Sequence, residues 1–303
     1  MTYIHYLAAT LLLVTALSCA FLPFISVWDR HLAVVRRRSL YDKSARQTES
    51  LTAGLHILFA VALAADLLMK GTIDAMLSGP WRFLWEVLVL SAASAALCAV
   101  IVRFAKKGVR SFFGVLAGLA GTLSACIVCV LVWSFYLGAL KEAAAGGEQA
   151  AQAFMVVLAG TQSVGFILFA VFSFCIALSC AYGFALCWHI LLRGKDDFGR
   201  DYYTFALGMR SRQAAYAGML VLPVSAVQFW MYPTVALEWA QTLLPGTREY
   251  AELILTGGML CFPVAVLFWY IMSRSALPMQ RRSLAFLAVI ILVAGIYCAL
   301  GRI

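Results

Sequence analysis

Long apolar stretches, separated by short segments that carry charge, glycine or proline, make up most of the chain. A helix that crosses the hydrocarbon core of a bilayer needs about 20 mainly apolar residues. The pattern predicts helices over residues 4–28, 51–70, 83–103, 111–139, 153–192, 214–237, 251–273 and 283–301. We therefore expect an all-α integral membrane protein with about eight transmembrane helices.

Composition agrees with a lipid-embedded chain. Of the 303 residues, 64% are hydrophobic and only 12% are charged, whereas soluble domains carry about 25% charged residues. The predicted helices leave little room for a soluble domain. The first apolar stretch is too long for the core of a signal peptide, so we expect it to be a retained helix.

Basic residues alternate between the connections. Of the 23 Lys and Arg, 18 lie in the first, third, fifth and seventh connections between the predicted helices. Because Lys and Arg resist translocation, these connections should face the cytoplasm and both termini should face outward. We expect a bacterial cytoplasmic (inner) membrane protein whose net charge of +9 reflects its topology. The lipid bilayer is then a partner and nucleic acid is not.

The cysteines indicate neither disulfide bonds nor a c-type haem. All nine lie within apolar stretches, which does not indicate a disulfide framework, and the Cys126–Cys129 pair lacks the His that follows in a c-type haem site.

The chain contains an internal repeat. The segment Ala16–Ala20 (ALSCA) recurs as Ala177–Ala181, and each copy precedes a charged connection with a tyrosine, Tyr41 or Tyr202. The repeat predicts two tandem four-helix units, residues 1–145 and 146–303, with parallel topology.

Few ionisable residues lie within the apolar stretches, where they usually mark function. Glu86 and Glu252 each follow an Arg by four residues near the start of a helix. They are candidates either for surface ion pairs or for acids that handle protons or a cofactor. Asp66 and Lys70 are interpreted as a pair at the outer membrane edge, in the second predicted helix.

The four histidines lie at different depths of the predicted helices. His31 and His189 fall near cytoplasmic helix ends, where an interfacial or solvated role is expected. His5 lies at the outer end of the first helix and His56 lies inside the second. A low-spin b-type haem needs two axial ligands from facing helices. Because His5 and His56 fall near opposite membrane faces, they cannot easily share one haem.

Residues 5–104 resemble the first three helices of subunit I of cytochrome bd-type quinol oxidases. The matching segments are Tyr3-Ile4-His5-Tyr6, Leu40-Tyr41-Asp42-Lys43 in the first cytoplasmic loop, Leu67-Leu68-Met69, Pro80-Trp81 and Glu86. The resemblance implies that His5 ligates haem iron and that Glu86 belongs to the same outer-side haem or proton site. His56 is a weaker candidate for cofactor binding.

The chain also departs from that family. Residues 153–186 contain no histidine, so the fifth-helix haem ligand has no counterpart, and the segment 238–250 is too short for the family's long quinol-binding loop. The resemblance therefore implies a reduced relative that keeps one haem b or none.

Two classes of function follow. The first is a membrane subunit of a respiratory electron-transfer complex, linked to quinone or haem and bound to partner subunits. Such a subunit would belong to a quinol-linked oxidoreductase. The alternative is a secondary transporter or a haem-free scaffold subunit. A bound chromophore would separate these classes.

Overall fold

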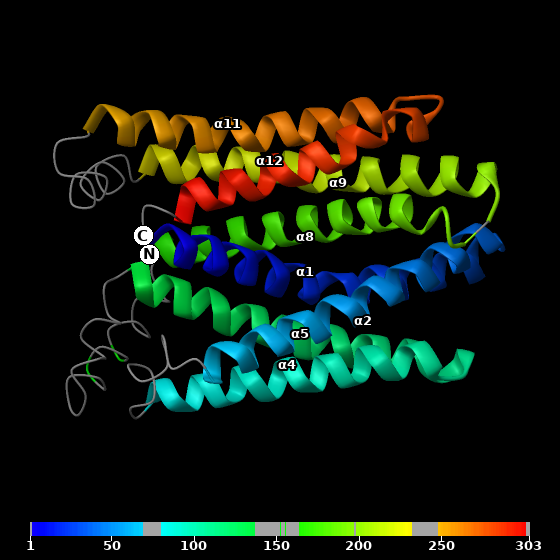
Figure 1. Cartoon of the computed structure of the whole chain (residues 1–303), viewed down its shortest axis with the longest axis horizontal. Helices are drawn as coiled ribbons and strands as arrows, with labels where there is room; N and C mark the ends of the chain where they lie inside the picture. The colour runs from blue at the N-terminus through cyan, green and yellow to red at the C-terminus, as the bar shows by residue number, and fades with distance from the viewer. Residues whose placement is uncertain are drawn as a thin grey trace. The chain divides into compact units, whose positions relative to one another are not determined.

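The computed structural model describes residues 2–68, 80–136, 164–196, 198–231 and 248–300, together with the single positions 152 and 155. All regular secondary structure in this part of the chain is helical (Figure 1). The helices are α1 (Thr2–Val35), α2 (Ser39–Leu68), α4 (Pro80–Phe104), α5 (Lys107–Tyr136), α8 (Val164–Leu192), α9 (Arg200–Met231), α11 (Arg248–Ser273) and α12 (Arg282–Leu300), with a short 3₁₀ helix, η1 (Pro278–Arg281), before α12. The predicted all-α class is confirmed.

Five of these helices contain segments that are long and apolar enough to cross a membrane. The segments are Leu13–Val35, Arg82–Phe104, Val109–Leu131, Ala170–Leu192 and Pro278–Ile296. The prediction of a membrane protein with transmembrane helices is thus supported by length and composition. Among the described side chains, α2 and α9 contain no comparable segment, and α11 contains only the shorter apolar segment Leu260–Ser273.

At their charged ends the helices run well beyond the apolar stretches. α1 continues to Val35 and α2 already begins at Ser39, so the first connection is only three residues long. Its middle residue, Arg37, has a φ of 50°, the left-handed conformation that commonly ends a helix. Residues 39–50, which we expected in a cytoplasmic loop, instead form the first three turns of α2.

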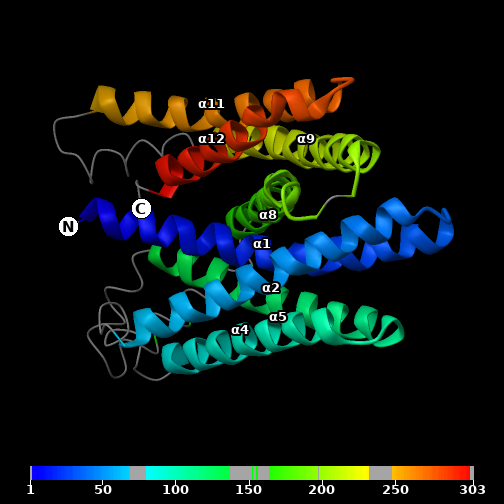
Figure 2. The same cartoon turned by 45° about the vertical axis from the view of Figure 1, so that its right-hand side comes forward.

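Close contacts between small residues hold the first compact unit, residues 15–170, together. Within it α4 and α5 lie side by side and α2 packs on α4 (Figures 1 and 2). Ala53, Ala99 and Ala117 form a buried cluster at these contacts. A Cβ atom added to Gly121 of α5 would lie 2.8 Å from the carbonyl oxygen of Cys19 in α1. Only glycine allows the two backbones to come so close.

The second compact unit consists of residues 171–303 together with residues 1–14. Within it α11 packs against both α12 and α9 (Figure 2). Trp269 of α11 is completely buried, and Gly183 of α8 leaves the space that its indole ring fills, since a Cβ there would lie 2.7 Å from the ring. Large apolar side chains such as Leu220, Leu260 and Ile290 are exposed, as expected for helices that face lipid.

Candidate functional site

Glu86 of α4 lies on the surface of the first unit. Its carboxylate accepts a hydrogen bond of 2.9 Å from Nε of Arg82, one helical turn earlier, and 54% of its side chain is exposed. The pair has the i,i+4 spacing of a surface ion pair. The side chain of His5, in the first turns of α1, lies outside the described residues, so a joint haem or proton site of His5 and Glu86 stays a prediction. The side chains of Asp66 and Glu252 and all of Lys70 also lie outside them.

His56 of α2 is buried in the first unit, with 1% of its surface exposed. Its Nδ1 donates a hydrogen bond of 2.7 Å to the carbonyl oxygen of Thr52. In the neutral ring this leaves Nε2 as an acceptor, and Nε2 has no hydrogen-bond partner among the described residues. A Cβ added to Gly121 would lie 3.3 Å from Nε2, so the ring edge is packed against α5. A buried imidazole nitrogen with a free lone pair can take up a proton.

A column of buried hydroxyl groups leads along α2 to His56. Ser44, Thr48 and Thr52 precede it at intervals of four residues, and all are buried. Thr48 donates a hydrogen bond of 2.9 Å to the carbonyl oxygen of Ser44, and Thr52 donates one of 2.8 Å to that of Thr48. The interval of twelve residues between Ser44 and His56 corresponds to about 18 Å of helix. We call these four residues the polar column.

The first residue of the polar column is hydrogen-bonded to a buried carboxylate. Ser44 donates a hydrogen bond of 2.8 Å to Oδ2 of Asp29 in α1, and both residues are completely buried. Buried charges in a helical membrane protein are costly unless they are paired or hydrogen-bonded. The Asp29–Ser44 contact therefore ties α1 to α2 and brings an acid to the end of the column.

Arg30 of α1, next to Asp29 in sequence, is the centre of an ion-pair network with α2. Its Nε and Nη2 donate to the two carboxylate oxygens of Glu49 at 2.5 and 2.8 Å, a bidentate geometry. Its Nη1 also lies 3.3 Å from Asp42, which in turn pairs with Arg46 at 3.1 Å. Glu49 is buried. These contacts explain why the charged segment 39–50 is helical rather than a loop.

Sequence reasoning assigned this network to a solvated connection and therefore missed it. The available signal was the spacing of Ser44, Thr48, Thr52 and His56, which places polar side chains on successive turns of one helix. The neighbouring opposite charges Asp29 and Arg30 were a further signal. Neither pattern identifies the partner helix, which depends on tertiary packing.

A haem does not fit at His56. Nε2 faces the backbone of α5 at Gly121, where even one added carbon would be 3.3 Å away. A b-type haem also needs a second axial ligand. Among the described side chains of the first unit, the candidates for that second ligand are His31 and Met155, and both are exposed. The His31 ring lies beside Trp28, with 5.6 Å between the ring centroids. The described residues also contain no group of three or more His, Cys, Asp or Glu that could hold a metal ion.

The second unit buries a different polar cluster. His189 of α8, for which we expected an interfacial or solvated role, is completely buried, and its Nδ1 donates a hydrogen bond of 2.5 Å to the carbonyl oxygen of Ala185. Its ring stacks on Tyr202 of α9 with 6.4 Å between centroids. Arg210 of α9 is also completely buried, with its guanidinium 5.9 Å from the centre of the Tyr182 ring. This cluster of aromatic and cationic groups joins α8 to α9.

The segments that carry the resemblance to bd-type oxidases lie in different surroundings. Leu40-Tyr41-Asp42-Lys43 is helical, within α2, and Tyr41 is buried. Pro80 and Trp81 begin α4, six and five residues before the exposed Glu86. The relationship itself stays a prediction. Comparisons of the chain with known protein families, curated proteins and solved structures found no match.

Proposed function

We propose that this chain is a membrane-embedded subunit of a quinone-linked respiratory electron-transfer complex, and that its first unit carries protons. The observation that supports the proposal is His56, a buried imidazole whose Nε2 has no partner among the described residues. It is the last residue of the polar column, whose first residue, Ser44, donates a hydrogen bond to Asp29. Ionisable side chains in the interior of membrane proteins mark proton or substrate pathways.

Proton transfer suits the chemistry of quinones. Oxidation of a quinol to a quinone releases two electrons and two protons, and the reverse reaction consumes them, so a quinone-linked complex needs a proton path. In the proposed path a proton moves between Asp29 and His56 through the hydroxyls of Ser44, Thr48 and Thr52. Successive members are about 6 Å apart along the helix, a gap that one bridging water spans. At the buried end of the column the ring of His56 must turn to accept the proton, because its Nδ1–H donates to Thr52 and its acceptor, Nε2, lies on the Gly121 side.

The path accepts protons without a bound cofactor. Electrons would pass through partner subunits or through a haem b at His5, as the resemblance implies. The first unit would then contribute the proton route. The ion pair of Arg30 with Glu49 holds the entrance to the column in place, because it joins the end of α1 to the start of α2.

We further propose eight transmembrane helices in two tandem repeats, residues 1–145 and 146–303, with both termini outside a bacterial cytoplasmic membrane. The two ALSCA segments are 161 residues apart, and Tyr41 and Tyr202 are separated by the same interval. Both tyrosines are buried in the first turn of their helices, α2 and α9. This shared position supports the repeat, and the excess of basic residues supports the orientation. The polar column then begins on the cytoplasmic side.

The proposal is tested on the assembly that co-purifies with the tagged chain from its native membrane in mild detergent. We expect this assembly to oxidise a short-chain ubiquinol or menaquinol and to give a reduced-minus-oxidised absorption spectrum. Thr52→Val should lower quinol turnover, because it removes a hydroxyl of the polar column.

Thr122→Val is the matched control. Thr122 of α5 also donates to the carbonyl oxygen four residues earlier, Gly118, at 2.8 Å, but it lies outside the column. Equal turnover in the two variants would contradict the path. An assembly without quinol activity whose chain nevertheless moves protons would favour a proton-coupled secondary transporter instead.

A further inference from the structure

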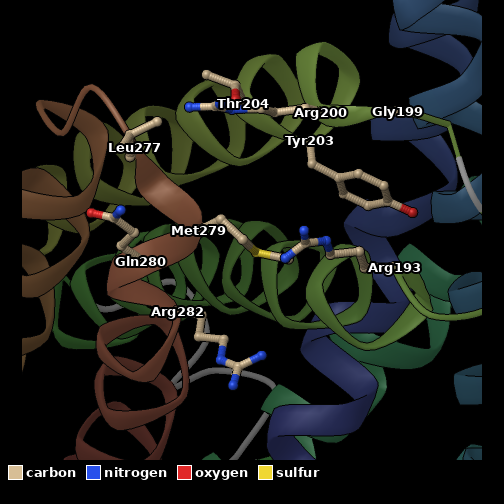
Figure 3. A pocket seen from close by; sticks show the side chains of 9 residues that line it. All are labelled: Arg193, Gly199, Arg200, Tyr203, Thr204, Leu277, Met279, Gln280 and Arg282. Atoms are coloured by element: carbon tan, nitrogen blue, oxygen red, sulfur yellow. The ribbon is translucent and has the colours of Figure 1, made fainter.

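A pocket of about 730 Å³ opens at the charged end of the second unit (Figure 3). Its lining comes from three places in the sequence: the residues that follow α8, the first turns of α9, and η1 with the start of α12. The volume lies within the range of pockets that hold small organic ligands.

Three arginines dominate the lining. Arg193, Arg200 and Arg282 come from these three places, and Figure 3 shows their side chains around the pocket. All three are exposed. Among the described residues none of them forms an ion pair with a carboxylate, in contrast to Arg30, Arg46 and Arg82 of the first unit. Three guanidinium groups without paired acids make the pocket strongly attractive to anions.

Neutral groups add to this preference for anions. Thr204 and Gln280 contribute a hydroxyl and an amide to the lining. Two helices of 32 and 19 residues, α9 and α12, begin at the pocket with Arg200 and Arg282. The first turn of a helix has backbone N–H groups without helical partners and carries a partial positive charge. Guanidinium groups, which can donate two parallel hydrogen bonds, and helix N-termini both commonly bind phosphate in proteins.

The pocket lies at the ends of potential membrane segments, which is the level expected for the membrane surface. Arg193 directly follows the potential membrane segment Ala170–Leu192, and Arg282 lies near the start of the segment Pro278–Ile296. Basic pockets between helices at this level bind the headgroups of anionic lipids. Met279 and Leu277 give the pocket an apolar side as well.

We propose that this pocket binds a phosphate ester through Arg193, Arg200 and Arg282. The proposal is independent of the function proposed for the first unit. The phosphate comes either from the headgroup of an anionic phospholipid or from a soluble phosphorylated compound. Both present the same oxygens to the three guanidinium groups. An arginine that makes a charge-assisted contact with phosphate is worth about a tenfold or greater change in affinity.

The test uses the full-length chain purified in a neutral detergent. One titration adds phosphatidylglycerol, with phosphatidylcholine as the uncharged reference, and counts retained lipids by native mass spectrometry. The other adds inorganic pyrophosphate and follows the midpoint of thermal unfolding. Each is repeated on Arg193→Gln, Arg200→Gln and Arg282→Gln, and on the control Arg281→Gln. Arg281 lies in η1 and is exposed, but it does not line the pocket.

Weaker retention of phosphatidylglycerol by about tenfold in each of the three pocket variants, with Arg281→Gln unchanged, would establish a lipid headgroup site. The same pattern for pyrophosphate, with lipid retention unaffected, would establish a soluble phosphate ligand. Equal losses in all four variants would show a diffuse charge effect and overturn the pocket. No loss in any variant would overturn it too. Unchanged helix content by circular dichroism shows that each variant is folded.

Discussion

Replacing Gly121 with alanine tests a close approach between the backbones of α1 and α5, at the point where His56 packs. The added Cβ would lie 2.8 Å from the carbonyl oxygen and 3.2 Å from the carbonyl carbon of Cys19, whereas ordinary contacts begin at 3.4 Å. These are backbone atoms in the middle of α1, so no side-chain rotation relieves the overlap. The helices must separate locally by about 0.6 Å, and overpacking of this kind costs about 1–3 kcal/mol of unfolding free energy.

Gly54→Ala is the matched control for this substitution. Gly54 lies in α2 of the same unit, and a Cβ there would have nothing within 4 Å. Because alanine favours a helix over glycine by up to about 1 kcal/mol, this variant should be as stable as the wild type or more stable.

Unfolding of both variants can be measured by titration with SDS in mixed micelles, followed by far-UV circular dichroism. We expect Gly121→Ala to unfold at a lower SDS fraction than the wild type and Gly54→Ala to unfold at an equal or higher fraction. If Gly121→Ala were as stable as Gly54→Ala, the close approach of α1 to α5 and the packing of His56 at Gly121 would be refuted.

The remaining predictions concern other contacts. Glu49→Gln should lower the unfolding free energy by about 3 kcal/mol, because it leaves Arg30 without its bidentate partner in a largely buried place. Arg46→Gln, which removes a half-exposed ion pair with Asp42, should change it by less than about 1 kcal/mol in the same SDS titration. Gly218→Ala should destabilise the second unit, because its Cβ would lie 2.5 Å from Cγ2 of Val266. Since that atom belongs to a side chain, the added change Val266→Ala should restore stability, and a double variant no better than the single one would argue against the contact. His5→Ala should remove any b-type haem, as measured by pyridine haemochrome, and an unchanged haem content would exclude His5 as the ligand.

The membrane class and the places of the long helices could be predicted from the apolar pattern alone, because lipid requires continuous apolar stretches. The helix ends could not. Residues 39–50 are polar enough for a loop, yet they are helical because Ser44 and Glu49 have partners on α1. A partner on another helix is a tertiary fact that no local pattern contains.

Part of the candidate site could likewise be predicted from the sequence, and part could not. The spacing of Arg82 and Glu86 indicated an i,i+4 pair, and the structure contains that pair at the surface. Burial of His56 and His189 could not be read from the sequence, because buried and lipid-facing sides of an apolar helix have the same composition. The arginine-lined pocket of the second unit could not be predicted from the sequence either, since its arginines are up to 89 residues apart in the chain.

Proton movement driven by quinol turnover tests the central claim most directly. The assembly that co-purifies with the full-length chain is reconstituted into vesicles that contain a pH-sensitive dye, and addition of a short-chain quinol starts turnover. We predict proton uptake for the wild type, uptake near that of empty vesicles for His56→Gln, and unchanged uptake for His31→Gln, since His31 is exposed and lies outside the polar column. Equal uptake by the wild type and His56→Gln, or none by the wild type, would contradict the account.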